Sequence, residues 1–102
     1  MTHAWAKRKR SLFQFFDWDE TKRRRNLEKH GIDLVAASKI FSCRFMDKRS
    51  PHQNEERFLA VGVLSDIEIT VVYTQRFRTC RIISARRART NERKAYYQSF
   101  SR

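Results

Sequence analysis

A cluster of arginines follows directly after a short apolar run in the last quarter of the chain. Arg81 comes directly before the run Ile82-Ile83-Ser84-Ala85, and Arg86, Arg87 and Arg89 follow that run closely. The apolar residues predict a buried strand that stops at Ser84-Ala85 and holds the guanidinium groups on a rigid support. Each guanidinium stays charged and can donate two parallel hydrogen bonds to a phosphate. The cluster therefore predicts a phosphate-binding site; a strand with a solvated, charged end is the alternative.

The whole chain carries a large excess of positive charge. Among its 102 residues, 23 are Lys or Arg and 11 are Asp or Glu, which gives a formal net charge of +12. This excess predicts a polyanionic partner, and nucleic acid fits it better than a membrane surface does. We find no apolar run of the roughly 18 residues that a membrane span needs, so no membrane role is expected.

Length and cysteine content fit one small cytoplasmic domain. We expect a single domain over residues 1–102, with a basic flexible arm over 1–12 and the folded part over 13–102. The apolar stretch beside the arm is too short for a signal peptide. Cys43 and Cys80 show no pairing or metal-ligand spacing, so we expect free thiols in a reducing cytoplasm.

Turn residues and apolar periodicity predict an α+β fold. Strands are indicated by alternating apolar residues, and helices by Asp or Thr caps and by a terminating Gly31. We expect, in chain order, an N-terminal edge strand near 13–18, a helical hairpin formed by a helix over 20–30 and a second helix capped by Asp33, a short strand at 45–47, an antiparallel β-meander of strands 57–64, 67–74 and 79–85, and a short C-terminal helix capped by Thr90.

The first predicted helix has an unusual surface. Leu27 is its only true hydrophobe, so the helix should lie on the surface of the domain with one shallow contact. Lys22, Asn26 and Lys29 fall on one side of it, where they could contact the backbone of a nucleic acid. An ordinary solvated helix face is the alternative.

Short motifs form an ordered series from about Phe16 to Tyr96. They are Phe16-Asp17-Trp18-Asp19, Lys22, Asn26, Lys29-His30-Gly31, Glu56-Arg57-Phe58, Gly62, Arg81-Ile82-Ile83-Ser84-Ala85-Arg86, Glu92 and Tyr96. In type and order this series resembles the BrnT family, the toxin half of type II toxin–antitoxin pairs. One departure is Ser42-Cys43-Arg44, because family members often carry Asp-Pro just after the second helix.

The resemblance implies a RelE-like α+β fold and a ribonuclease activity that slows translation. RNA would be the substrate, and a cognate BrnA-type antitoxin would bind and neutralise the toxin. The family's toxin–antitoxin complex represses its own operon, so operator DNA would be bound only through that complex. A non-catalytic basic domain that binds nucleic acid remains the alternative, since charge and aromatic residues suffice for binding.

A ribonuclease can use the 2′-hydroxyl of its substrate as the nucleophile and then needs no cofactor. It has to hold the phosphate, stabilise the charge of the transition state and move protons. We predict that Lys22, Arg57, Arg81 and Arg86 surround the scissile phosphate. No metal site is expected, because the histidines and cysteines lack zinc-site spacing and no acidic cluster suggests magnesium.

Two further roles are open in this scheme. His30 could carry the proton, since imidazole titrates near neutral pH, although a histidine before a terminating glycine often only contacts the last helix carbonyls. Glu56 could be the base beside Arg57, or could form an ordinary surface ion pair with it. Trp18 or Tyr96 could stack on a nucleobase, a contact of roughly 1–3 kcal/mol, or could belong to the core.

Overall fold

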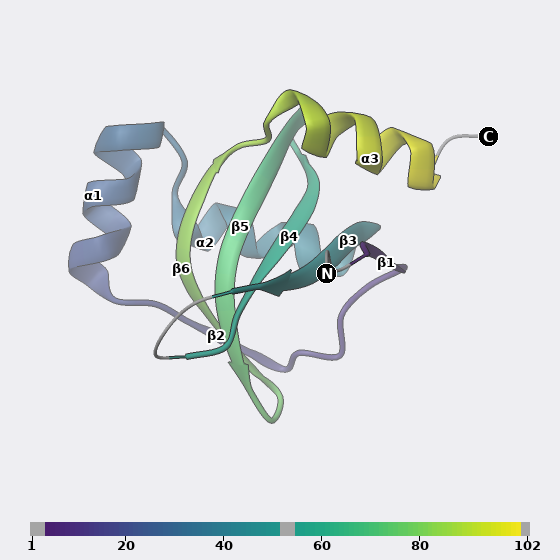
Figure 1. Ribbon diagram of the computed structural model, residues 1–102. Coiled ribbons are helices and arrows are strands. Elements are labelled where there is room, and N and C mark those ends of the chain that lie inside the picture. Colours follow the sequence, from purple (N-terminus) through teal and green to yellow (C-terminus); the bar gives the residue numbers. More distant parts are fainter. Residues whose placement is uncertain (1–3, 52–54, 101–102) are drawn as a thin grey trace.

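A curved six-stranded sheet organises the part of the chain that the computed structural model describes, residues 4–51 and 55–100 (Figure 1). The elements in chain order are β1 (Ala6–Arg8), β2 (Phe15–Asp17), α1 (Glu20–His30), α2 (Leu34–Ala37), the 3₁₀ helix η1 (Ser38–Ser42), β3 (Phe45–Ser50), β4 (Arg57–Leu64), β5 (Ile67–Arg76), β6 (Thr79–Arg87) and α3 (Thr90–Phe100). The predicted α+β class is confirmed.

The strands lie in the order β1-β3-β4-β5-β6-β2. Within this order β4, β5 and β6 form the predicted antiparallel meander, and β2 pairs in parallel with β6 at one edge of the sheet. The predicted N-terminal edge strand is therefore present, although it is shorter than 13–18. The turn from β4 to β5 has positive φ at Ser65 (50°) and Asp66 (66°), the pattern of a type I′ hairpin.

The last strand of the meander, β6, is longer than predicted. We expected it to stop at Ser84-Ala85, but Arg86 and Arg87 still pair with Thr70 and Ile69 of β5. The backbone of β5 offers hydrogen-bonding partners to the backbone of these two arginines. The strand therefore continues through them although their side chains are charged. The strand therefore ends at Arg87.

The basic segment predicted as a flexible arm contributes a strand. Ala6–Arg8 form β1, which pairs antiparallel with β3. Arg8 Nε donates to both carboxylate oxygens of Asp47 at 3.3 Å, and Lys48 Nζ lies 4.5 Å from the centre of the Trp5 ring. The prediction is wrong at these residues because the open edge of β3, together with an acidic partner, orders a charged segment.

Helix α1 begins and ends as its sequence predicts. The Asp19 carboxylate accepts hydrogen bonds from the backbone N–H groups of Thr21 (2.8 Å) and Lys22 (3.1 Å), which caps the first turn. Gly31 ends the helix with φ of 70°, a left-handed conformation that other residues adopt at a cost.

None of the helices in the described ranges is long and apolar enough to cross a membrane.

The second predicted helix is split into α2 and η1. Asp33 caps α2 by accepting a hydrogen bond from the N–H of Val35 at 3.0 Å, as expected. After Ala37 the chain tightens into the 3₁₀ helix, which packs closely on β4. Gly62 permits this close approach, because a Cβ there would lie 2.9 Å from Cβ of Ile40.

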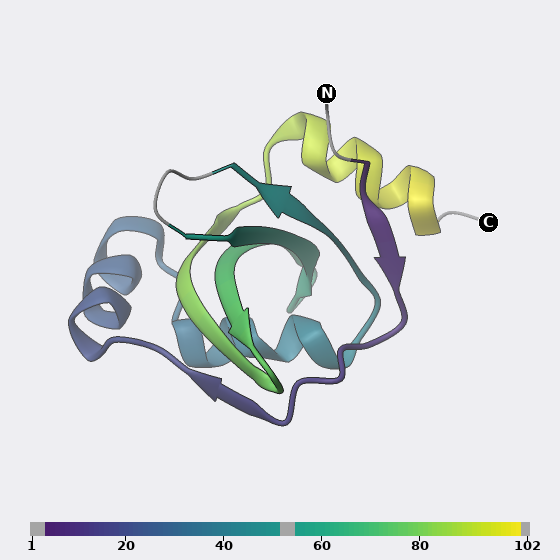
Figure 2. The same ribbon diagram turned by 60° about the horizontal axis from the view of Figure 1, so that its bottom comes forward.

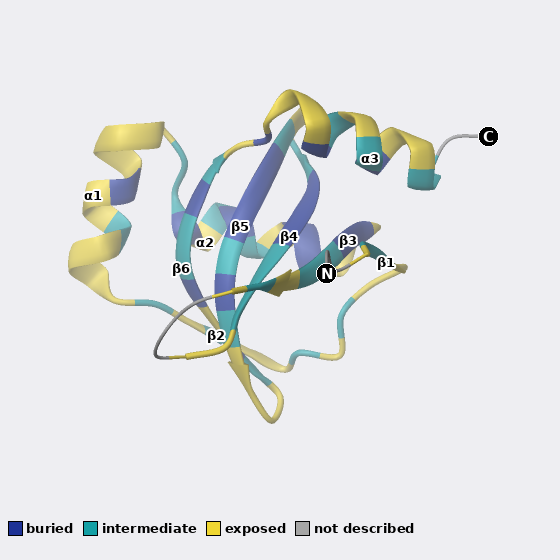
Figure 3. Cartoon of the chain, viewed as in Figure 1, coloured by how far each residue is buried: buried dark blue, intermediate teal, exposed yellow. Residues whose placement is uncertain are grey.

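Pleating gives the sheet two faces with different coverings. Face A, to which Ala60 and Val71 point, wraps around α2 and η1 and holds the larger core (Figure 2). Face B, to which Val61 and Thr70 point, packs against α3, with Tyr96 in a smaller core. Figure 3 shows the buried residues concentrated in the middle strands, whereas most of α1 is exposed. Away from α3, at Arg57, Thr74 and Arg81, the open part of face B is partly or fully exposed.

The Asn26 side chain fastens α1 to the sheet. The Asn26 amide nitrogen donates to the carbonyl of Ala85 (2.9 Å) and to that of Ile32 (2.8 Å), and its oxygen accepts from the N–H of Ala85 (3.1 Å). Asn26 is buried although its helix neighbours are exposed. It thus completes the backbone hydrogen bonding of β6 and fixes the position of the helix.

Asn26→Ala should destabilise the fold by roughly 2–4 kcal/mol, because it leaves buried backbone groups of Ala85 without partners. Urea unfolding at neutral pH measures this loss. Arg25→Ala, at an exposed position of the same helix, is the matched control and should stay within about 0.5 kcal/mol of the wild type. Equal stabilities of the two variants would contradict the role given to Asn26.

Candidate active site

Two of the predicted phosphate-binding arginines lie in one row across face B. Arg81 of β6 pairs with Thr74 of β5, and Arg57 of β4 continues the same register beyond the pair of Phe58 and Tyr73. Residues paired across strands point to the same side of a sheet, so both guanidinium groups project from face B. One strand separates them, which places their backbones about 10 Å apart. Arg81 lines a hollow on this face, whereas Arg57 is not among the residues that line it.

A bulge in β6 brings a third arginine to the same face. The register between β5 and β6 shifts at Val72 and Tyr73, which leaves Ile83 as an extra residue. Without the bulge, Arg81 and Arg86 would point to opposite faces, because side chains alternate along a strand. Their partners on β5 are four residues apart, so the two arginines are separated by about 13 Å.

Arg86 is engaged in a structural ion pair. Its guanidinium donates to both carboxylate oxygens of Glu92 on α3, at 2.8 and 3.0 Å. Glu92 is buried and also accepts from the hydroxyl of Thr70 (2.9 Å) and the N–H of Arg89 (2.7 Å). Burial by itself would raise the pKa of Glu92, but these hydrogen bonds, led by that from Arg86, hold it below its usual value. Arg86 thus fastens α3 to the sheet.

A hollow of about 730 Å³ lies beside Arg81. It also contains Glu56, the predicted base, so the structure brings these two predicted residues together. The full lining consists of Asp17, Glu55, Glu56, Thr74, Gln75, Arg76, Phe77, Thr79 and Arg81. Among the described residues, no three His, Cys, Asp or Glu side chains lie together in an arrangement that could hold a metal ion.

The ion pairs around this hollow are exposed. Arg81 Nη1 lies 3.3 Å from Asp17 Oδ1, with each side chain about half exposed (51% and 52%). Arg57 Nε lies 2.8 Å from Glu55 Oε1, and Glu56 pairs with Arg49 rather than with Arg57. Exposed pairs contribute only about 0–1 kcal/mol, so a phosphate can displace the acid from either arginine.

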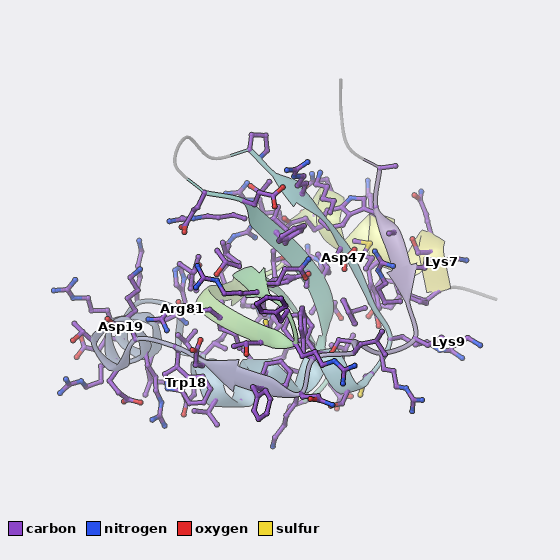
Figure 4. The ribbon with its side chains drawn as sticks, turned by 90° about the horizontal axis from the view of Figure 1, so that it is seen from below. Lys7, Lys9, Trp18, Asp19, Asp47 and Arg81 are labelled. Carbon is purple, nitrogen blue, oxygen red and sulfur yellow. The ribbon has the colours of Figure 1, made fainter. Side chains whose placement is uncertain are left out.

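The amino end of α1 lies at the same edge as Arg81. Hydrogen bonding by the Lys22 N–H holds the pKa of Asp19 below its usual value, and the charges of Lys22 and Arg81 lower that pKa further. Both cations therefore lie within electrostatic range of one carboxylate. Figure 4 shows Trp18, Asp19 and Arg81 together at this edge, far from Lys7 and Lys9.

The residues predicted at the carboxyl end of α1 lie elsewhere. His30 and Arg87 line a separate, largely apolar hollow of about 350 Å³ together with Leu27. Lys22 and His30 are eight residues apart on the helix, a distance of about 12 Å. Lys29 is exposed at the same helix end. The structure therefore does not bring His30, Lys29 or Arg87 to the row of Arg57 and Arg81.

Three other predicted contacts are used by the fold. The amide of Asn26 is occupied by backbone partners and has no group free for RNA. Tyr96 is 8% exposed and donates its hydroxyl to the carbonyl of Arg44 at 3.2 Å. Trp18 packs against the larger core and donates from Nε1 to Glu20 at 2.9 Å. Tyr96 therefore cannot stack on a base while it remains packed.

Several residues of the hollow were not among the predicted ones. Asp17 and Thr74 join it through their register with Arg81. Arg76 joins it as the last residue of β5, and Phe77 from the turn that follows. The alternation of β5 could have indicated the face of Thr74. The register between strands could not be read from the sequence.

A model of one known protein family matches residues 18–92. The family is described as the ribonuclease toxin, BrnT, of type II toxin–antitoxin systems. The matched segment includes α1, the meander and Glu92 of α3. The search of curated proteins found no match to the chain.

Acid should weaken the attachment of α3 through Glu92. Because the folded pKa is lowered, the ion pair with Arg86 contributes stability that is complete above the ordinary value of 4.5 and is lost as the pH falls through the lower folded value. The urea midpoint should therefore fall more steeply with acid in the wild type than in Glu92→Gln. At neutral pH that variant should be less stable by roughly 1–3 kcal/mol. If the urea midpoints of the two proteins fell equally steeply with acid, the role given to Glu92 would be contradicted.

Proposed function

Because the chain belongs to the BrnT family of ribonuclease toxins of type II toxin–antitoxin systems, we propose that it cleaves RNA without a metal ion and thereby inhibits translation. Family membership makes RNA the substrate and an antitoxin protein the partner. The observation that carries the mechanism is the row of Arg57 and Arg81 on the open part of face B. We further propose that the protein acts in the cytoplasm, where translation takes place.

The two arginines would hold the scissile phosphate between them. When the 2′-hydroxyl attacks phosphorus, negative charge builds up on the phosphate oxygens, and fixed cations stabilise it. Lys22, at the amino end of α1, would add a third positive charge from the side of Arg81. Guanidinium groups need no reorganisation for this task, because they stay charged at every pH at which RNA is stable.

Glu56 is the proposed proton acceptor. It lines the hollow beside Arg81 and is exposed, so a bound phosphate can draw Arg49 away and free the carboxylate. The proton of the 2′-hydroxyl would pass to Glu56, the new bond would form from the 2′-oxygen to phosphorus, and the bond to the 5′-oxygen would break. The leaving 5′-oxygen would take a proton from Lys22 or water. The products would be a 2′,3′-cyclic phosphate and a 5′-hydroxyl.

A BrnA-type antitoxin is the proposed inhibitor. With a net charge of +12, the chain attracts an acidic segment as readily as RNA, and such a segment over the row of Arg57 and Arg81 would block the site. Operator DNA would then be bound only by the complex of this protein with its antitoxin.

Arg81→Ala should lower the rate of RNA cleavage by roughly 100-fold or more, since it removes a cation from the transition state. The rate is measured with purified protein on a labelled RNA. Lys39→Ala is the matched control, because it removes one positive charge from η1, on the opposite side of the sheet. Unchanged cleavage and RNA affinity in Arg81→Ala would remove this residue from the site.

Cleavage should proceed in excess chelator and leave 2′,3′-cyclic phosphate ends. The reason is that the substrate supplies the nucleophile and the protein supplies the stabilising charge. Mass spectrometry of the fragments identifies these ends. Loss of cleavage in chelator, with recovery on adding a divalent ion, would contradict metal independence, and RNA that stays intact but bound would favour a binding domain.

A further inference from the structure

The hairpin between β5 and β6 carries an exposed aromatic residue at its tip. Phe77 is 97% exposed, more than any other large hydrophobic residue in the described ranges, and it belongs to neither core cluster. Arg76 and Arg78, on either side of it, are exposed as well. Figure 1 shows this hairpin projecting beyond the rest of the sheet. Folding does not account for an aromatic ring at this position.

The backbone at the tip is unfavourable for phenylalanine. Phe77 has φ of 54°, and Arg78 is not among the described residues with positive φ. Positive φ at only the first central residue is the pattern of a type II′ turn, where glycine is the usual residue. A bulky side chain there is an outlier, and such outliers cluster at functional sites. The tip thus keeps a phenylalanine where a glycine would fold more easily.

The tip separates two hollows on opposite faces of the sheet. Phe77 and Gln75 line the hollow beside Arg81 and also a groove of about 680 Å³ on the side of face A. The hairpin therefore forms the ridge over which an extended ligand would pass from the proposed cleavage site to the groove.

The groove on the far side of the ridge is strongly basic. Its charged lining consists of Arg8, Arg10, Asp47, Lys48, Arg49 and Arg78. Asp47, the single acid among them, already accepts hydrogen bonds from Arg8 and, at 3.4 Å, from the Tyr73 hydroxyl. Aromatic rings of Phe13 and Phe58 line the groove as well. Cations beside aromatic rings are the composition of a surface that binds single-stranded nucleic acid without sequence preference.

We propose that the tip Arg76-Phe77-Arg78 is an RNA-binding subsite in which the Phe77 ring stacks on a nucleobase next to the scissile phosphate. Arg76 and Arg78 contact the phosphates on either side of that base, and the strand continues into the basic groove. The subsite rests on the proposed function in one respect, namely that RNA occupies the hollow beside Arg81. A protein contact would also use an exposed ring, but two flanking cations and the shared border with that hollow favour RNA.

The test measures binding separately from cleavage. The probe is a single-stranded RNA of 12 nucleotides with a 2′-O-methyl group at every position, which cannot react, and its affinity is measured by fluorescence anisotropy. Phe77→Gly should weaken binding by about 5- to 150-fold, the range found for stacking on one base. It should also raise the thermal midpoint, because glycine relieves the positive φ. Phe77→Trp should retain affinity within about threefold.

Controls separate stacking from charge. Tyr97→Ala removes an exposed aromatic ring from α3, at the other end of the molecule, and should bind the probe like the wild type. Arg78→Ala should reduce the slope of log affinity against log salt by about 0.7, the value for one phosphate of a single strand. Phe77→Gly should leave that slope unchanged, since the ring carries no charge.

Each outcome bears on one proposal. If the wild type cleaves RNA and Phe77→Gly binds the probe as tightly as the wild type does, the subsite is wrong and the proposed function stands. If the wild type does not cleave but Phe77→Gly weakens binding, the subsite stands and the proposed function fails. If Phe77→Gly leaves the affinity for the probe intact and weakens binding of the co-expressed antitoxin, the tip is a protein contact and the subsite is overturned.

Discussion

The hydrogen bonds between Asn26 and Ala85 are the interaction on which the placement of the site depends. Helix α1 has almost no apolar surface of its own, so packing alone would hold it weakly. One buried amide satisfies both backbone groups of Ala85 and thereby fixes the helix against β6. Because Lys22 belongs to this helix and Arg81 to this strand, the clamp also fixes the distance between two cations of the proposed active site.

The geometry of β6 assigns different tasks to arginines that are neighbours in the sequence. Alternation sends Arg87 to face A, and the bulge at Ile83 returns Arg86 to the face that carries Arg81. Arg86 then meets a buried carboxylate and becomes structural, whereas Arg81 meets an exposed one and stays available. The cost of leaving a buried charge unpaired makes the first pair permanent, and the weakness of exposed pairs makes the second exchangeable.

Charge and strain mark the surfaces that the fold does not need. Exposed or partly exposed ion pairs lie at the hollow beside Arg81 and at the groove beyond the hairpin tip, and Phe77 holds an unfavourable backbone between them. Residues that stabilise the fold, in contrast, have their polar groups paired. Among the described side chains, none has a buried polar atom without a hydrogen-bond partner. The ion pairs that a ligand can exchange most easily thus lie along the proposed path of RNA.

Features that depend on neighbouring residues follow from the sequence alone. The cap at Asp19, the end of α1 at Gly31 and the meander could be predicted because short spacings specify them. The BrnT family was indicated by the resemblance of an ordered series of motifs, and the family match confirms it. The folded arrangement, in contrast, decides which arginines form buried ion pairs and which form exposed ones, why Asn26 is buried and how residues 6–8 join the sheet. Those outcomes depend on strand register and on partners far away in the chain, and register follows from the packing of the whole sheet rather than from any local signal.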